Sequence, residues 1–364
     1  MKVVHVIEPF ATGINTFVYE IVTGNPEFEH TIVYGKRSGL QNINAILDSY
    51  ENKVKFVPWI HVQREVSIIK DARALLTLIK ILKSKEIDVL HLHSSKAGVL
   101  GRIAAFVLGI KNVVYTPNAV AFLRTDIGTV KRWVFRTIER LTALLPGVIV
   151  SSSRSEFQAL YKLGIPSKII NNGVTTINNV SCNSNTPFVI TMVGNITIQK
   201  NPVLFNAIAS AFQQNNNVSF LWVGDGDMRN VLSSENITIT GWLEKKEVLQ
   251  KLKESSIYLS TSSWEGLSLA GIEAMSFGLP MLVKECVGNV NLVQQNFNGF
   301  IFNEVDEVVG YIKELMNNTE LYKSLSHGAI ERYKMKYTGS IVSSNYRKLY
   351  LHEQEKNNEK LLVN

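Results

Sequence analysis

Short apolar runs alternate with longer stretches of mixed polarity from one end of the chain to the other. MKVVHVIE at the N-terminus and IDVLHLH at 87–93 have the length and composition of buried strands in a parallel sheet. Stretches with helical spacing of apolar residues lie between such runs, for example near 66–84 and over 128–145. This alternation predicts an α/β fold with doubly wound parallel sheets.

A polar segment at 171–186 interrupts the alternation. NNGVTTINNVSCNSNT has no apolar periodicity, so it is predicted to be a linker. The alternation restarts directly after it with the strand PFVITMVG at 187–194. We therefore expect two tandem Rossmann-like domains that face a central cleft, over 1–175 and 185–335. A C-terminal helix within 336–364 could cross back to the first domain.

The positive charge is confined to the first half of the chain. Residues 1–180 contain 22 Lys and Arg against 13 Asp and Glu, whereas the remaining residues contain 16 against 18. A basic domain is typical of proteins that bind polyanions. Because the sequence has no zinc-finger spacing, RNP-like motif or low-complexity tail, we expect no nucleic-acid partner. A membrane surface with anionic lipids is the better candidate.

The rest of the composition is that of a globular protein. Hydrophobic residues make up 45% and charged residues 19% of the chain, and there are two cysteines. Two cysteines are too few for a disulfide framework, so free thiols in a reducing compartment are expected. The N-terminus lacks the layout of a signal peptide, and no run reaches the roughly 18 apolar residues that span a bilayer. We expect a cytoplasmic protein.

The segment SSWEGLSLAGIEAMSFGLP at 262–280 carries two glutamates in apolar surroundings. Glu265 follows the predicted strand SIYLSTS, and Glu273 lies in a helix that Ser268 is expected to cap. A helix would separate the two carboxylates by about 12 Å, too far to share a proton. They would instead line one wall of a cleft and accept hydrogen bonds from two parts of a ligand. A capping glutamate and a surface glutamate are equally good interpretations on spacing alone.

Two turns of the second domain are candidate ligand-binding sites. Lys200, in VGNITIQKNP, lies between a strand and the start of a helix, where backbone N–H groups and the helix dipole favour a diphosphate. A solvated loop lysine is the commoner explanation of its position alone. VGDGD at 223–227, with Gly224, is a second glycine turn at the end of a strand. Because a third glycine is missing there, this second signal is weak.

In their residues and in their order along the chain, these motifs resemble those of retaining glycosyltransferases of family 4 (glycosyl transferases group 1), which have the two-domain GT-B fold. The shared pattern S-x-x-E-G-L-x5-E-A-M-x-x-G-x-P covers 262–280, and QKNP, GDG, GW, VGN and NGF accompany it in the second domain. HLHSSKAGVLGRIAA and VVYTPNAVAF carry the resemblance in the first domain. The resemblance spans most of the chain and implies sugar transfer from a nucleotide diphosphate donor.

The resemblance also implies a role for each residue of the donor site. Glu265, with Gly266 and Leu267, would bind the donor sugar, and Glu273 would contact the ribose. Lys200 would neutralise the diphosphate. The other implied donor-site residues lie in turns of both domains: Gly13, Gly194, Asn195 and Gly224.

The chain departs from the family pattern at two positions. Asn195 follows Gly194 where the family often has arginine, so one partner for the phosphates is missing. The turn at 116–118 reads Thr-Pro-Asn instead of Thr-Pro-His, and the side chain of Asn118 cannot exchange a proton near neutral pH. This is compatible with front-face displacement, in which the departing phosphate takes the acceptor's proton. Asn118 is therefore expected to position the sugar.

We expect no metal cofactor. The GDGD run at 224–227 is predicted to be a turn, and no Asp-x-Asp or His/Asp cluster lies in a suitable setting. His91 and His93 alternate with apolar residues in a predicted strand, so buried histidines with satisfied hydrogen bonds are expected. A glycosidase pair would need carboxyls that face each other across the scissile bond, which the arrangement of Glu265 and Glu273 does not favour.

Two segments of the first domain are candidates for the acceptor or membrane side. HSSKAGVLGR places Lys96 and Arg102 after the strand at 87–93, and bacterial surface-polysaccharide transferases often carry this run. The segment 125–147 is predicted to be a basic amphipathic helix, which is typical of helices that lie in a bilayer interface. Its basic and aromatic residues include Lys131, Arg132, Trp133 and Arg136. A solvated basic face and an apolar side that packs on the domain's own core are the alternatives.

The sequence as a whole predicts a cytoplasmic glycosyltransferase that is peripherally bound to the inner face of the cytoplasmic membrane. It would move a sugar, with retention at the anomeric carbon, from a UDP-linked donor to a lipid-diphosphate-linked glycan of a bacterial surface polysaccharide. A UDP-sugar 2-epimerase of the same architecture is one alternative, although Asn118 and the Glu-x7-Glu spacing disfavour it. A nucleotide-sugar-binding protein without catalytic activity is the other.

Overall fold

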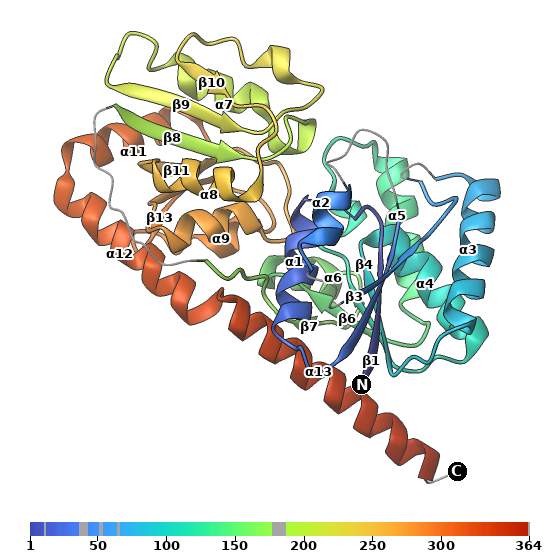
Figure 1. Ribbon diagram of the computed structural model, residues 1–364. Coiled ribbons are helices and arrows are strands. Elements are labelled where there is room, and N and C mark those ends of the chain that lie inside the picture. Colours follow the sequence, from blue (N-terminus) through green and yellow to red (C-terminus); the bar gives the residue numbers. More distant parts are fainter. Residues whose placement is uncertain (11, 36–42, 51–53, 64–65, 177–186, 363–364) are drawn as a thin grey trace. The chain divides into compact units, whose positions relative to one another are not determined.

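The computed structural model describes residues 1–10, 12–35, 43–50, 54–63, 66–176 and 187–362. The chain divides into two compact units: unit 1 comprises Met1–Leu123, Gly128–Gly173 and Gly339–Asn364, and unit 2 comprises Arg124–Ile127 and Val174–Thr338. Each unit contains one parallel sheet with helices packed on it (Figure 1). Most of the segment predicted to be a linker, residues 177–186, lies outside the described residues.

Unit 1 is built on a seven-stranded parallel sheet. Its strands are β1 (Lys2–Ile7), β2 (Glu29–Tyr34), β3 (Val54–Pro58), β4 (Val89–His93), β5 (Val113–Thr116), β6 (Val148–Ser151) and β7 (Lys168–Ile169). They are ordered β3-β2-β1-β4-β5-β6-β7. The chain therefore builds outward from β1 in one direction and then, from β4, in the other. The switch point of this sheet lies between β1 and β4.

The helices of unit 1 follow the strands in regular alternation. They are α1 (Thr12–Thr23), α2 (Ile43–Asp48), α3 (Ile68–Lys83), α4 (Ser95–Leu108), the 3-10 turn η1 (Ala121–Leu123), α5 (Thr129–Thr142), α6 (Arg154–Tyr161) and α13 (Gly339–Leu362). Strand residues such as Val4 and Leu90 share a core with Leu78 of α3 and Ala104 of α4. Some apolar positions of the predicted helices lie outside this core: Leu76 of α3 and Val134 of α5 are exposed.

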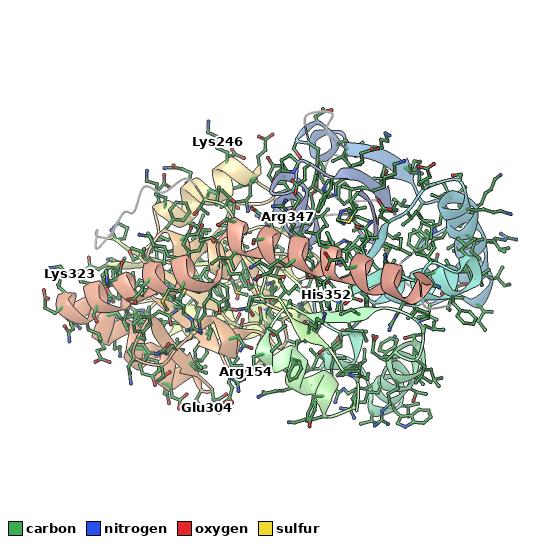
Figure 2. All side chains as sticks on the ribbon, turned by 90° about the horizontal axis from the view of Figure 1, so that it is seen from below. Arg154, Lys246, Glu304, Lys323, Arg347 and His352 are labelled. Carbon is green, nitrogen blue, oxygen red and sulfur yellow. The ribbon has the colours of Figure 1, made fainter. Side chains whose placement is uncertain are left out.

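The last helix, α13, packs against α1 within unit 1 (Figure 1). A Cβ at Gly24 would lie 2.3 Å from Ser343 Cβ, so only glycine permits this contact. Asn25 Nδ2 donates to the carbonyl of Ser343 over 3.2 Å, and Arg347, labelled in Figure 2, pairs with Glu27 over 2.9 Å. The C-terminal helix is thus an integral part of unit 1.

Unit 2 contains a six-stranded parallel sheet. Its strands are β8 (Phe188–Val193), β9 (Val218–Val223), β10 (Ile237–Ile239), β11 (Ile257–Ser260), β12 (Met281–Lys284) and β13 (Gly299–Phe302). The order β10-β9-β8-β11-β12-β13 places the switch point between β8 and β11. The prediction of two Rossmann-like parallel sheets is confirmed.

The longest helices of unit 2 come last along its chain. The helices of this unit are the 3-10 turns η2 (Ile198–Lys200) and η3 (Arg229–Val231), and α7 (Pro202–Ser210), α8 (Lys245–Lys253), α9 (Leu269–Ser276), α10 (Asn289–Leu292), α11 (Val305–Asn317) and α12 (Thr319–Lys336). The last two, α11 and α12, are separated by a single residue. Asn318 ends α11 and its side chain caps α12 by accepting from the N–H of Leu321.

Candidate active site

Unit 2 brings Lys200 and Glu265 together at its switch point. β8 and β11 are neighbours in the sheet although two strands separate them in the chain, and open parallel sheets bind ligands where such strands end. Lys200 lies in η2, which follows β8, and Glu265 lies in the loop after β11. Lys200 Nζ donates to Glu265 Oε1 over 2.6 Å. A cation and a carboxylate therefore meet at the edge where a ligand is expected.

Glu265 is held in place by its own loop and by the loop at 287–289. Ser262 Oγ donates to the same carboxylate oxygen over 2.8 Å, and the N–H of Glu265 donates to the carbonyl of Val287 over 3.0 Å. A Cβ at Gly288 would lie 2.6 Å from Glu265 Cβ, and the φ of Gly288, 87°, also favours glycine. The backbone of this loop thus lies directly against Glu265, which is only 8% exposed.

The charge on Lys200 is maintained by its surroundings. Burial alone would lower the pKa of Lys200, but the carboxylate of Glu265, together with Tyr258 and Cys286, holds that pKa above its ordinary value. Lys200 therefore stays protonated in the neutral range. An ammonium group in this position has donors for a carboxylate and for an incoming diphosphate at the same time.

Glycines shape the turn that carries Lys200. Gly194 follows β8 with a φ of 148°, and a Cβ there would lie 2.8 Å from Lys200 Cε. Trp222 Nε1 donates to the carbonyl of Gly194 over 2.8 Å. A Cβ at Gly224, after β9, would lie 2.3 Å from that same carbonyl oxygen. Asn195 is half-buried beside this turn, at the position where the family often has arginine.

Glu273 lies in α9, a short distance along the chain from Glu265. Ser268 Oγ accepts from the N–H of Gly271 over 3.2 Å, so the prediction that Ser268 caps this helix is confirmed. Glu273 is 3% exposed, and its carboxylate pairs with Lys245 Nζ. Sequence reasoning missed Lys245, the first residue of α8. Its signal in the sequence is weak, because a lysine at the start of an amphipathic helix is ordinarily a solvated residue.

The other residues predicted for the donor site lie in two different places. Gly266 and Leu267 are buried beside Glu265 in the loop between β11 and α9. Gly13 was expected in a turn, but it is an exposed residue in the first turn of α1. The first N–H groups of a helix have no intrahelical partner, so glycine costs little there and its N–H remains available. Cys286 is a free cysteine, and burial raises the pKa of its thiol to about 12.

In unit 1, Asn118 lies in a turn directly after β5, at the carboxyl end of that strand. Asn118 and Ala119 both adopt positive φ, 52° and 85°. The half-buried side chain of Asn118 places Nδ2 at 3.5 Å from the carbonyl of Thr116. Sequence reasoning also missed Glu156, whose buried carboxylate accepts hydrogen bonds from the backbone of this turn. Its signal was hidden because Glu156 also fits an ordinary position in the first turn of a helix.

Three buried histidines form a hydrogen-bonded row across β1, β2 and β4. His30 Nε2 lies 3.1 Å from the carbonyl of Asn25, which can only accept, so this nitrogen carries a proton. His30 Nδ1 then accepts from His5 Nε2 over 3.1 Å, and His5 Nδ1 accepts from His93 Nε2 over 3.1 Å. With neutral rings, His93 Nδ1 is left as an acceptor, and this buried atom has no partner among the described residues.

The prediction of satisfied, buried histidines is confirmed for His91 but not for His93. His91 Nδ1 lies 2.6 Å from the hydroxyl of Tyr350 in α13, and Nε2 lies 2.9 Å from Thr116 Oγ1. Ring nitrogens of His5, His91 and His93 lie within 4.8 Å of one another, which is the spacing of potential metal ligands. Hydrogen bonds already occupy both ring nitrogens of His91 and of His5, so a metal ion would have to displace them.

Lys96 and Arg102 do not lie on an exposed acceptor face. Arg102 is 1% exposed; its Nη2 donates to Glu139 Oε1 over 3.1 Å and to Thr142 Oγ1 over 2.8 Å. The expectation that Arg102 faces a ligand is therefore wrong, because the guanidinium is buried in an ion pair between α4 and α5. Lys96 Nζ pairs with Asp71 Oδ1 over 2.7 Å, and its side chain is largely covered.

The helix predicted at 125–147 is α5, and its outer side is both basic and apolar. Lys131 and Arg136 are exposed, and Arg132 is half-buried. Trp133 is 65% exposed, and Val130, Val134, Leu141 and Leu144 are also exposed large apolar residues in or directly after this helix. Phe135 instead packs against the core of unit 1. Among the helices of the described residues, none is long and apolar enough to cross a bilayer.

Two Rossmann-like units, with the Lys200–Glu265 pair at the switch point of unit 2, have the architecture of a glycosyltransferase of the GT-B class. The family model described as Glycosyl transferases group 1 matches residues 175–332, and Glycosyltransferase Family 4 matches residues 11–177. One relative is the Escherichia coli UDP-Gal:alpha-D-GlcNAc-diphosphoundecaprenol alpha-1,3-galactosyltransferase, which is 31% identical over 353 residues, or 88% of each chain. The chain belongs to this glycosyltransferase family.

More distant relatives and solved structures agree with this assignment. The Staphylococcus aureus capsular polysaccharide biosynthesis glycosyltransferase CapM is 21% identical and matches 84% of this chain and 86% of its own. Anabaena HepE, solved with UDP and glucose, superposes with a TM-score of 0.76 at 16% identity, covering 96% of this chain and 98% of its own. Staphylococcus aureus TarM gives 0.74 at 12% identity, covering 96% and 98%. At these identities the structures establish the fold.

Proposed function

We propose that this glycosyltransferase moves a sugar from a UDP-sugar to a lipid-diphosphate-linked glycan during synthesis of a bacterial surface polysaccharide, with retention and without a resident metal. The observation that carries the proposal is the Lys200–Glu265 pair, with 2.6 Å between Nζ and Oε1, at the switch point of unit 2. The Escherichia coli relative is named for galactosyl transfer from UDP-Gal to a GlcNAc-diphosphoundecaprenol, which supports both substrate classes.

The donor has a separate partner for each of its parts. Lys200 supplies the positive charge for the diphosphate, which is an anion. Glu265 accepts from hydroxyls of the sugar, and Glu273 from those of the ribose. Lys245 already contacts Glu273, so it lies where a cation can neutralise that carboxylate beside the nucleotide. The missing arginine at Asn195 leaves Lys200 as the principal partner for the phosphates.

The proposed reaction needs no side chain that exchanges protons. The bond between the anomeric carbon and the diphosphate oxygen breaks while an acceptor hydroxyl attacks the same face of that carbon. The leaving diphosphate oxygen takes the hydroxyl proton, so the products are free UDP and a glycoside with the donor's anomeric configuration. Lys200 stabilises the charge that develops on the leaving group. The side chain of Asn118 donates hydrogen bonds to sugar hydroxyls and accepts hydrogen bonds from them, which holds the sugar in its orientation.

We propose that α5 places the enzyme on an anionic membrane surface, at the cytoplasmic face where a lipid-linked acceptor would be available. Trp133 and the basic residues on its outer side are the residue types that favour the bilayer interface. No nucleic-acid partner is proposed. The exposed apolar residues of this helix favour membrane binding over a solvated basic face, because a helix that contacts only water gains nothing from exposed apolar side chains.

The test is a donor panel with the full-length protein. UDP-, GDP- and dTDP-sugars are each incubated with a synthetic GlcNAc-diphospho-lipid dispersed in detergent, and nucleotide release and glycolipid product are measured. We expect release of UDP coupled to product. Glu265→Gln should lower kcat about 100-fold, the magnitude typical of one lost electrostatic contact. The control is Glu235→Gln, an exposed residue of the same unit, which should keep the rate. Full turnover by Glu265→Gln would overturn the site.

A further inference from the structure

The turn that carries Asn118 is held in an uncommon backbone conformation. Two consecutive residues, Asn118 and Ala119, have positive φ, and alanine has no side-chain group that compensates for this conformation. Such a turn persists only where its surroundings over-determine it. A group that stabilises this conformation must bond to the backbone, because the methyl side chain of Ala119 forms no hydrogen bonds.

Glu156 is that group. Its Oε1 accepts from the N–H of Ala119 over 2.9 Å and from the N–H of Val120 over 3.0 Å. Its Oε2 accepts from the N–H and the hydroxyl of Ser152, both over 2.8 Å. Glu156 is fully buried, so these four donors take the place of water around its carboxylate.

The two carboxylate oxygens of Glu156 have different tasks. Oε2 bonds within its own segment, at the start of α6, which Ser153 caps by accepting from the N–H of Glu156 over 3.2 Å. A capping glutamate needs no more than this local contact. Oε1 instead reaches 37 residues back along the chain, to the turn after β5. Helix capping therefore accounts for one oxygen and leaves the other as a clamp on the turn.

Thr116, the last residue of β5 before this turn, is fixed by a second set of hydrogen bonds. Thr116 Oγ1 bonds to His91 Nε2 and to the hydroxyl of Tyr346 in α13, each over 2.9 Å. The turn is thus held on one side by the side chain of Thr116 and on the other by the carboxylate of Glu156. Asn118 lies between these two attachments. Its orientation depends on both of them.

We propose that Glu156 is a positioning residue for sugar transfer: its carboxylate sets the turn that orients Asn118. The inference rests on the proposed function, because it is Asn118 that would contact the sugar. Glu156 itself touches no substrate. Loss of the clamp should therefore lower kcat while the affinity for UDP, whose proposed site lies in unit 2, stays the same.

The test compares Glu156→Gln with the matched variant Glu139→Gln, which alters another buried glutamate of unit 1. A glutamine at 156 keeps the shape of the side chain but has one acceptor oxygen in place of two and no negative charge. It can no longer accept hydrogen bonds from all the donors around it, so the clamp on the turn is weakened. We expect kcat with detergent-dispersed acceptor to fall about 10-fold or more, since small misplacements of reacting groups are costly. UDP affinity should be unchanged. Glu139→Gln should keep kcat, even if it lowers thermal stability.

A second-site variant separates positioning from general stability. Glycine adopts positive φ without strain, so Ala119→Gly favours the turn independently of the clamp. Adding Ala119→Gly to Glu156→Gln should recover at least threefold in kcat without restoring thermal stability. A role in stability alone predicts no such recovery. Wild-type kcat in Glu156→Gln, or an equal loss of kcat in both glutamate variants, would overturn the proposal.

Amide hydrogen exchange tests the clamp without any activity. The N–H groups of Ala119 and Val120 should be protected in the wild type and should exchange at least 10-fold faster in Glu156→Gln, with no such change in Glu139→Gln. Equal protection of these two N–H groups in all three proteins would overturn the clamp. A wild type that transfers no sugar from any donor would instead refute the proposed function, and the exchange result would still decide whether Glu156 sets the turn.

Discussion

The buried histidines of unit 1 predict a steep loss of stability on mild acidification. Burial lowers the pKa of His93 to about 3, and burial together with the neighbouring rings lowers the pKa of His5 and of His91 well below the ordinary range. In the unfolded chain each histidine titrates near pH 6.5. Below that pH the unfolded state binds protons that the folded state does not, so the free energy of unfolding falls as the pH falls.

The magnitude follows from this difference in proton binding. Between pH 7.5 and 5.5, each histidine that stays neutral in the folded state costs about 1.4 kcal/mol. His5, His91 and His93 together therefore remove about 4 kcal/mol, a large part of the 5–15 kcal/mol by which typical proteins are stable. The loss begins near pH 6.5 and continues downward toward the folded-state pKa of His93, about 3. His30, whose pKa burial also lowers, adds to the effect.

Urea unfolding at pH 7.5, 6.5 and 5.5 measures this dependence. His93→Gln keeps a donor for His5 Nδ1 and removes one titrating ring, so about a third of the loss should disappear. The control is His352→Gln on the exposed side of α13 (Figure 2), which should leave the dependence intact. Stability that is equal at pH 7.5 and 5.5 would show that these histidines do not stay neutral in the folded state, as would a His93→Gln variant with the full pH dependence.

Three further predictions concern the donor site and α5. Lys200→Met should weaken UDP binding about 10- to 100-fold in calorimetry, since a charge-assisted contact is worth about 1.5–3 kcal/mol, and unchanged affinity would contradict its phosphate role. Lys245→Met should raise KM for the UDP-sugar more than it lowers kcat, and a loss confined to kcat would argue against nucleotide contact. Arg136→Ala should weaken binding to anionic vesicles about fivefold in flotation assays. Trp133→Ala should also weaken it, whereas Tyr161→Ala, an exposed aromatic residue on α6, should not; equal losses for both would contradict an interface at α5.

The fold could be predicted because its signal is local and repeated. Each strand of a parallel sheet is buried on both faces and so appears as a short apolar run, and each connecting helix shows its own spacing. Ser268 could be identified as a helix cap for the same reason, since a cap and its helix are adjacent in sequence.

The site could be predicted only where a motif brings its residues close in the sequence. Glu265 and Glu273 lie in one segment, so the sequence motif of that segment was enough to mark both as candidate site residues. Arg102 was misjudged because its partner, Glu139, lies 37 positions away and nothing in the sequence pairs them. Glu156 was missed for the same reason. The pairing of long-range partners is decided by tertiary packing, and a single sequence does not show it.

The anomeric outcome of the reaction is the most direct test of retaining sugar transfer. The full-length protein is incubated with UDP-α-galactose and a detergent-dispersed GlcNAc-diphospho-lipid, and the new linkage and free UDP are followed by NMR. We expect one UDP released for each glycosidic bond formed, with an α-linkage in the product. A β-linked product would contradict retention, and an epimerised sugar still attached to UDP would contradict sugar transfer itself.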